Sequence, residues 1–86
     1  MNRKQRIKNI LISKFSEFSI EIIDNSKLHA GHQNFNGMEE THIQIILKNK
    51  FLKKVNRLQI HREINKLIKD EFNLGLHSLE IKINQL

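Results

Sequence analysis

The sequence predicts an α+β domain in two layers, with helices covering one face of a three-stranded mixed sheet. Two stretches place apolar residues at the three- and four-residue spacing of an amphipathic helix, and other stretches alternate apolar and polar residues as half-buried strands do. The chain also contains 14 isoleucines, whose β-branched side chains favour strands and stiff cores. We therefore expect one domain over residues 1–86 in the order α-β-β-α-α-β.

The first half of the chain predicts a helix followed by a long hairpin. Residues 3–18 form the expected helix, residues 19–24 a short strand and residues 41–47 a second strand. The polar stretch 25–40 between the strands contains two of the three glycines, and long loops without secondary structure are often functional. The apolar residues of the helix are Ile7, Ile10, Leu11, Phe15 and Phe18.

The second half predicts a helical connection and a closing strand. Residues 48–56 are a basic connection with room for one helical turn, and residues 57–73 keep helical spacing. Gly75 stands where a glycine commonly ends a helix, and residues 76–83 alternate as a third strand. The apolar residues at helical spacing are Ile60, Ile64, Leu67, Ile68 and Phe72. The residues expected in the core are Ile64, Leu67, Ile68, Leu79, Ile81 and Ile83.

Connection lengths predict how the strands pair. The first two strands follow each other directly and should be antiparallel, whereas residues 48–75 are long enough for a helical crossover between parallel strands. The second and third strands would then start at the same edge of the sheet. This arrangement brings together His29, His32, His42 and His77, and leaves His61 towards the opposite end.

Each histidine also has an ordinary structural interpretation. His29 and His32 could be solvated loop residues, and His77 lies on the apolar side of its strand, which fits a hydrogen-bonded histidine at the edge of the core. His42 has the opposite parity to Ile43, so we expect it on the outer face. A zinc site made of these four histidines is disfavoured, because structural zinc sites generally use cysteine.

His61 and Arg62 open the expected long helix. A positive charge near a helix N-terminus opposes the helix dipole, so we interpret His61 as a neutral, structural residue.

Composition narrows the classes of function. The chain has no cysteine and no apolar run near the roughly 20 residues of a membrane span, and its basic N-terminus lacks the features of a secretory signal. We expect a cytoplasmic protein without a membrane segment. It has no recognisable nucleophile–histidine–acid set and no phosphate-binding glycine loop, and the adjacent Glu39 and Glu40 should point apart, so we expect no catalysis.

The net charge of +6 and the isoelectric point near 9.9 raise the question of a polyanionic partner. AT-rich codons would also enrich lysine, asparagine and isoleucine without any selection for binding. The charge is nevertheless uneven, and residues 48–62 contain six cations and no acid. The candidate nucleic-acid-binding residues are Lys48, Lys50, Lys53, Lys54, Arg57 and Arg62.

An ordered set of segments resembles the BolA family. The segments are HAGH at residues 29–32, ETHIQIIL at 40–47, Phe51, LQIHREINKLIKDEF at 58–72 and LHSLEIKI at 76–83. The chain departs from the family pattern at Lys53, where a glycine is usual, and at Ile60, which replaces the first arginine of an Arg-His-Arg sequence.

The resemblance implies a class II KH-like fold and a monothiol glutaredoxin as partner. In such pairs a [2Fe-2S] cluster is shared, with the glutaredoxin cysteine and glutathione on one side and histidines of the BolA protein on the other. The implied ligands are His29 and His77, and His32 could replace or support His29. Imidazole can ligate one iron of a two-iron cluster, as in Rieske centres.

The expected role is iron–sulfur cluster delivery or iron-responsive regulation, with no cofactor in the isolated protein and a monomer or weak homodimer when alone. The alternative implied by the family is a transcriptional regulator that binds DNA through the basic KH-like surface.

Overall fold

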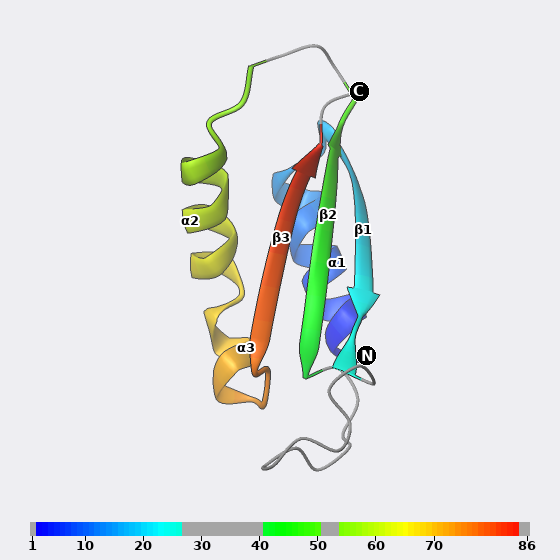
Figure 1. Cartoon of the computed structure of the whole chain (residues 1–86), viewed down its shortest axis with the longest axis vertical. Coiled ribbons are helices and arrows are strands. Elements are labelled where there is room, and N and C mark those ends of the chain that lie inside the picture. Colours follow the sequence, from blue (N-terminus) through cyan, green and yellow to red (C-terminus); the bar gives the residue numbers. More distant parts are fainter. Residues whose placement is uncertain (1, 27–40, 51–53, 85–86) are drawn as a thin grey trace.

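The computed structural model describes residues 2–26, 41–50 and 54–84. Its helices and strands follow the expected order along the chain (Figure 1). The elements are α1 (Arg3–Lys14), β1 (Phe18–Asp24), β2 (His42–Asn49), α2 (Arg57–Leu67), α3 (Lys69–Asn73) and β3 (Ser78–Asn84).

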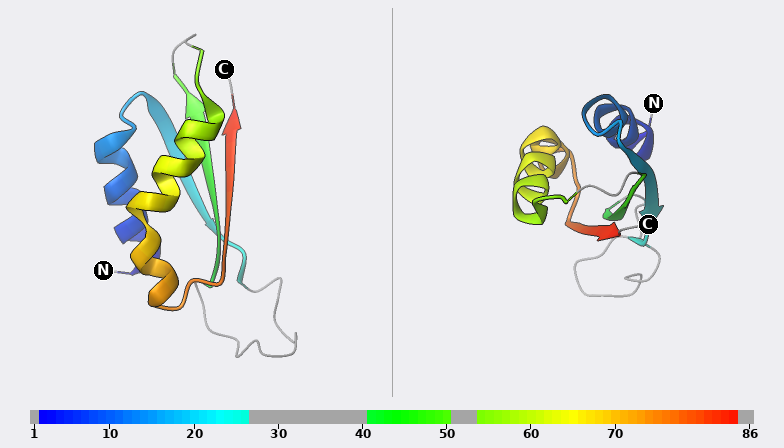
Figure 2. Two further views of the ribbon diagram at one scale, coloured as in Figure 1. Left: turned by 90° about the vertical axis from the view of Figure 1, so that its left-hand side faces the viewer. Right: turned by 90° about the horizontal axis from the view of Figure 1, so that it is seen from above.

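The three strands form one mixed sheet in the order β1-β2-β3. β1 runs antiparallel to β2, with Phe18 opposite Asn49, and β2 runs parallel to β3, with His42 opposite Ser78. α1 and α2 both lie on the same face of this sheet (Figure 2). The predicted α+β architecture and the predicted pairing of the strands are confirmed.

The core lies between the sheet and the helices. On β2, Ile43, Ile45 and Leu47 are almost fully buried, whereas the residues between them are partly exposed, which is the alternation expected of a strand covered on one side. α1 contributes Ile7 and Leu11 to the same cluster, and the second helical segment contributes Ile64 and Ile68.

The first helix is shorter than the sequence predicts. α1 ends at Lys14 rather than near residue 18, because Phe15 leaves helical geometry with φ −121° and ψ 55°. The N–H of Phe15 still makes the last helical hydrogen bond, 2.7 Å to the carbonyl of Leu11. Phe18 already belongs to β1. Both phenylalanines are nevertheless buried, and their rings meet edge to face with centroids 6.1 Å apart. The apolar pattern therefore predicted the core residues correctly and the boundary incorrectly.

The predicted long helix is interrupted at Ile68. The chain forms α2 and then the five-residue α3, so the short helix that the structure describes follows the long one. Glu71 lies seven residues after the buried Ile64 and is itself buried, whereas Phe72 is 40% exposed. Phe72 keeps the helical spacing of the segment but does not belong to the core.

Gly75 ends the helical segment as predicted. Its φ of +115° is a backbone conformation that residues with a Cβ rarely adopt. The reversal allows the N–H of Leu76 to donate to the carbonyl of Glu71 and directs the chain into β3.

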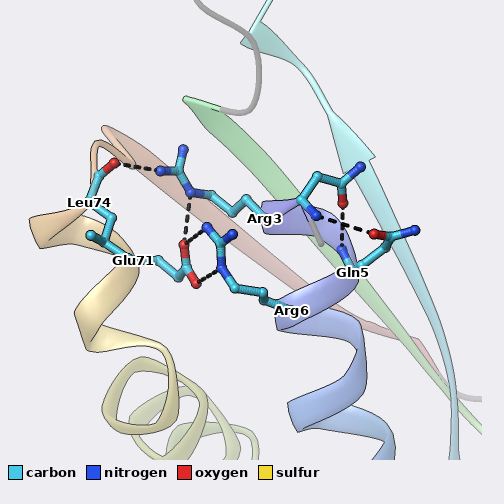
Figure 3. Close-up of polar contacts among 6 residues, drawn as sticks. Arg3, Gln5, Arg6, Glu71 and Leu74 are labelled. Atoms are coloured by element: carbon cyan, nitrogen blue, oxygen red, sulfur yellow. Dashed lines mark hydrogen bonds and ion pairs between the residues drawn. The ribbon is translucent and has the colours of Figure 1, made fainter.

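A buried ion-pair cluster joins the two ends of the helical layer (Figure 3). Arg3 donates to Glu71 at 2.9 Å and to the carbonyl of Leu74 at 2.7 Å. Arg6 donates to both carboxylate oxygens of Glu71 at 2.8 Å. The side chains of Arg3 and Glu71 are about nine-tenths buried, whereas that of Arg6 is 37% exposed. Residues that are 68 positions apart in the sequence are thereby fixed to one another.

The two guanidinium groups determine the ionisation of Glu71. The hydrogen bonds from Arg6 are the largest influence and lower the pKa of the carboxyl group; burial opposes them, and Arg3 adds to the lowering. The carboxylate is therefore the form that the fold favours.

We expect Glu71→Gln to lower the free energy of unfolding at pH 7 by about 2 kcal/mol, because it leaves two guanidinium groups without their anion. Since folding lowers the pKa of Glu71, the stabilisation is present above the ordinary glutamate pKa of about 4.3 and is lost as the pH falls through the lower pKa of the folded protein. Urea unfolding from pH 7 downwards should therefore show the two proteins converging in acid. Glu63→Gln, at an exposed position of α2, is the matched control and should change little.

Candidate functional site

The start of β3 is attached to the residue that precedes β2. The backbone N–H groups of His77 and Ser78 both donate to the carbonyl of Thr41, at 2.7 and 3.1 Å. On the other side of β2, the N–H of Asn25 donates to the carbonyl of His42 at 2.7 Å. Three segments that are distant in the sequence thus meet at the end of the sheet where β2 and β3 begin, as the parallel pairing predicts. We call this end of the sheet the histidine edge.

Two imidazole rings lie against each other at this edge. The rings of His42 and His77 are 5.8 Å apart between centroids and meet edge to face at 74°. Thr41 Oγ1 is 3.0 Å from His42 Nδ1, a hydrogen bond in which either atom can be the donor. Thr41 is buried, His42 is half-buried and His77 is exposed. Thr41 and His42 are therefore held in place, whereas the imidazole of His77 is accessible to solvent.

The end of β1 is also held in place. The N–H and the hydroxyl of Ser26 both donate to Asp24 Oδ1, at 2.9 and 2.6 Å, and Ser26 is almost completely buried. This local turn fixes the direction in which the chain leaves the sheet after β1.

The structure locates only part of the predicted histidine group. His77 precedes β3 and is exposed, so the alternative in which it is a histidine at the edge of the core is wrong. His42 has the expected parity and lies near His77, as the strand pairing predicts, although the direct contact between their rings was not predicted. His29 and His32 lie outside the described residues.

The available ligands fit a metal group that is completed by another molecule. Within residues 2–26, 41–50 and 54–84, no three histidine or acidic side chains are placed to hold a metal ion. The chain has no cysteine, and the accessible imidazole of His77 offers one nitrogen to a group that approaches from outside. The chemistry of this edge therefore suits shared ligation better than a closed site.

Two of the basic residues predicted to bind nucleic acid line different hollows of the surface. Lys48, Lys50, Lys54, Arg57 and Arg62 are all exposed, and Lys53 lies outside the described residues. Lys50 lines a hollow beside the C-terminal end of α1 and the start of β1, whereas Arg62 lines a groove between α1 and α2.

The groove between α1 and α2 collects cations that the sequence analysis did not select. It has a volume of about 710 Å³, and four cations line it: Lys14, Arg62, Lys66 and Lys69. Glu63 is the acidic residue on its wall, and Leu67 supplies apolar surface. The spacing of Arg62, Lys66 and Lys69 is helical and could have been noticed, but the approach of Lys14 depends on how the helices pack.

Two further expectations concern single features. His61 lies in the second turn of α2, where it is half-buried, and its backbone carbonyl accepts a 2.8 Å hydrogen bond from the Asn65 side chain. In the part of the chain that the structure describes, no helix has both the length and the apolar character needed to cross a membrane.

Comparison with known proteins assigns the family. Residues 11–85 match the family model described as BolA-like protein. An uncharacterised Sinorhizobium protein is 34% identical over 83 residues, covering 95% of this chain and 89% of that protein. The chloroplastic protein BOLA1 of Arabidopsis thaliana is 32% identical over 82 residues, covering 93% of this chain and 51% of that protein.

Solved structures agree with this assignment. BolA1 from Arabidopsis thaliana superposes with a TM-score of 0.76 at 30% identity, covering 99% of this chain and 93% of that one. The BolA domain of SufE1 from the same plant gives a TM-score of 0.74 at 28% identity, covering 99% and 94%. The chain belongs to the BolA family, and the resemblance noted in the sequence is confirmed.

The geometry of this edge predicts an unusual contrast at His77. Its backbone N–H should exchange with solvent at least about tenfold more slowly than in an unstructured peptide, because it is bonded to Thr41, while its imidazole remains accessible. Hydrogen–deuterium exchange followed by NMR measures the first property, and the rate of imidazole modification by diethyl pyrocarbonate measures the second. Free exchange of the His77 amide would contradict the attachment of β3 to Thr41.

Proposed function

We propose that this BolA-family protein is a non-catalytic adaptor that pairs with a monothiol glutaredoxin and shares a [2Fe-2S] cluster with it. The cluster would be cargo, passed on in iron–sulfur delivery or read as a signal of iron supply. The observation that carries the proposal is the exposed imidazole of His77, held at the start of β3 beside Thr41 and His42. Membership of the BolA family supports it, because the family resemblance implies this partner.

In this proposal the protein contributes nitrogen ligands and a fixed surface, and the partner contributes thiolate. His77 would supply one imidazole, and His29 or His32 would supply the other from the segment between β1 and β2. A cysteine-free chain cannot hold such a cluster with four thiolates, so a thiol-bearing partner and glutathione would complete the ligand set. The cluster itself would supply a capacity for electron transfer, or iron and sulfide that can be passed to another protein.

The parallel sheet explains why this arrangement is robust. Thr41 immediately precedes β2, and its carbonyl accepts from the N–H of His77, so the backbone that carries the imidazole is tied to the start of the sheet. Ligands on rigid elements lose less freedom on binding than ligands on loops do. His77 is thus a preorganised ligand.

Replacing His77 by alanine tests the proposal. The glutaredoxin and this protein, reconstituted together with iron, sulfide and glutathione, should give a visible absorption and circular dichroism spectrum distinct from that of the glutaredoxin homodimer. His77→Ala should shift the spectrum towards that of the homodimer and shorten the lifetime of the mixed complex, because one imidazole ligand is missing.

His61→Ala is the matched control, since that histidine lies in α2 away from the start of β3. Its spectrum should equal that of the unchanged protein. A mixed complex with His77→Ala whose spectrum also equals that of the unchanged pair would refute the assignment of His77 as a ligand.

A second candidate function, nucleic-acid binding, is favoured by one observation. The groove between α1 and α2 brings together Lys14, Arg62, Lys66 and Lys69, and none of these four cations has an ion-pair partner within the described ranges. Unpaired cations along a groove attract phosphates, and their contribution to affinity depends steeply on salt. Among the described residues, no aromatic side chain lines the groove for base stacking, so contacts would be to the nucleic-acid backbone and independent of base sequence.

Replacing lysines that line the groove should affect nucleic-acid binding and leave cluster sharing unchanged. Lys66→Gln combined with Lys69→Gln should weaken binding of double-stranded DNA and reduce the slope of log affinity against log salt by about 2. Fluorescence anisotropy at several salt concentrations measures both quantities. Lys8→Gln combined with Lys82→Gln, at exposed positions of α1 and β3 outside the groove, removes the same two charges and is the control for net charge. Equal losses in the groove variant and the control would show that only the overall charge matters.

A further inference from the structure

We infer that His42 is a positioning residue for His77: its ring, tied to Thr41, holds the exposed imidazole in the orientation required of a ligand. This inference rests on the proposed function, because it assigns a role within the same site. It concerns a residue that neither the sequence pattern nor the family resemblance selected as a ligand, and it follows from the contacts among Thr41, His42 and His77.

The His42 ring is itself restrained. Thr41 Oγ1 lies 3.0 Å from His42 Nδ1, and this hydrogen bond fixes the plane of the ring whichever atom donates. Thr41 is 3% exposed, so the hydroxyl group that makes this bond belongs to a buried residue. The backbone of His42 is also held, because its carbonyl accepts from the N–H of Asn25, the residue that follows β1. The ring is therefore a rigid surface and not a mobile side chain.

His77 has a fixed backbone and an exposed side chain. Its N–H is bonded to the carbonyl of Thr41, the same residue whose hydroxyl group restrains His42. The contact with the His42 ring, edge to face at 5.8 Å, limits the rotamers that the exposed imidazole can occupy. Thr41 thus acts twice, through its backbone on one histidine and through its side chain on the other.

Such an arrangement affects ligation through entropy. An exposed histidine that samples several rotamers must lose that freedom when it binds a metal, and a neighbour that restricts the rotamers beforehand reduces this cost. Residues that orient metal ligands typically change metal affinity by about 10- to 100-fold when they are replaced. Because the contact between His42 and His77 is one ring against another, we expect an effect near the lower end of that range.

A different role for His42, as a ligand itself, makes a different prediction. A metal ligand needs its nitrogen atom, whereas a positioning residue needs only a ring of similar shape. Phenylalanine can therefore replace His42 as a positioning residue but not as a ligand. The three informative variants are His42→Phe, which keeps a ring, His42→Ala, which removes it, and Thr41→Val, which removes the hydroxyl group and keeps most of the volume.

The first measurement uses the isolated full chain and needs no cluster. The three-bond couplings about the Cα–Cβ bond of His77, and nuclear Overhauser effects between rings 42 and 77, should indicate one dominant rotamer in the unchanged protein. His42→Ala should give rotamer-averaged couplings, His42→Phe should keep one rotamer, and Thr41→Val should fall between them. Unchanged His77 couplings in His42→Ala would overturn the inference. Dispersed amide spectra establish that each variant is folded.

The second measurement uses the complex with a monothiol glutaredoxin, reconstituted with iron, sulfide and glutathione. His42→Ala should keep the circular dichroism spectrum of the unchanged pair but lose the cluster to a chelator about five- to tenfold faster, and His42→Phe should restore the lifetime to within about twofold. If His42→Ala and His42→Phe both change the spectrum as His77→Ala does, His42 is a ligand and the inference is wrong.

The two measurements also separate this inference from the proposed function. If the unchanged pair forms no mixed cluster, the proposed function fails, and the rotamer measurement on the isolated chain alone decides whether His42 restrains His77. If the cluster forms and His77→Ala changes its spectrum, while His42→Ala leaves both rotamer and lifetime unchanged, the proposed function stands and the positioning role is overturned.

Discussion

The parallel pairing of β2 and β3 is the constraint on which the rest of the structure depends. Parallel neighbours need a crossover, and the chain supplies it with α2 and α3, which return from the end of β2 to its beginning. The crossover places both helices of that connection on the face already covered by α1, so that one core serves the whole sheet (Figure 2). The same pairing brings His77 to Thr41 and His42, although 34 residues lie between His42 and His77. The core and the candidate site therefore share one cause.

Ion pairs as well as apolar contacts hold the helices together. Arg3 and Arg6 enclose Glu71, and Arg3 also satisfies the carbonyl of Leu74 beside the glycine that ends the helical segment. An ion pair in this position adds little net stability compared with apolar packing, but leaving one partner alone is costly. Its consequence is specificity: α1 and α3 meet in one register, and the turn at Gly75 that leads into β3 is fixed with them.

The two candidate surfaces are built in different ways and lie on different parts of the fold. The histidine edge consists of residues held by the sheet backbone, where a small number of side chains have defined orientations. The groove between α1 and α2 consists of long, exposed cations whose positions are averaged in solution. The first arrangement suits ligation, which requires direction, and the second suits attraction of a polyanion, which requires only charge. The two surfaces therefore suit different kinds of binding partner.

The sequence by itself determined the architecture, the strand pairing and the family. Helical spacing, alternation and connection length depend on residues close together in the chain, and they predicted the order of elements, the buried isoleucines and the turn at Gly75. The ordered segments that resemble the BolA family predicted the result of the comparisons. Boundaries were less certain, because Phe15 and Phe18 keep an apolar pattern across the end of α1.

Only the tertiary structure decided which distant side chains meet. No periodicity in the sequence relates Arg3 to Glu71, because their contact depends on how α1 packs against α3. The sequence predicted that His42 and His77 lie at the same end of the sheet but not that their rings touch, since strand parity assigns the two residues to opposite faces. Parity describes the middle of a strand, and both histidines lie at the edge of the sheet, where β2 begins and the chain enters β3.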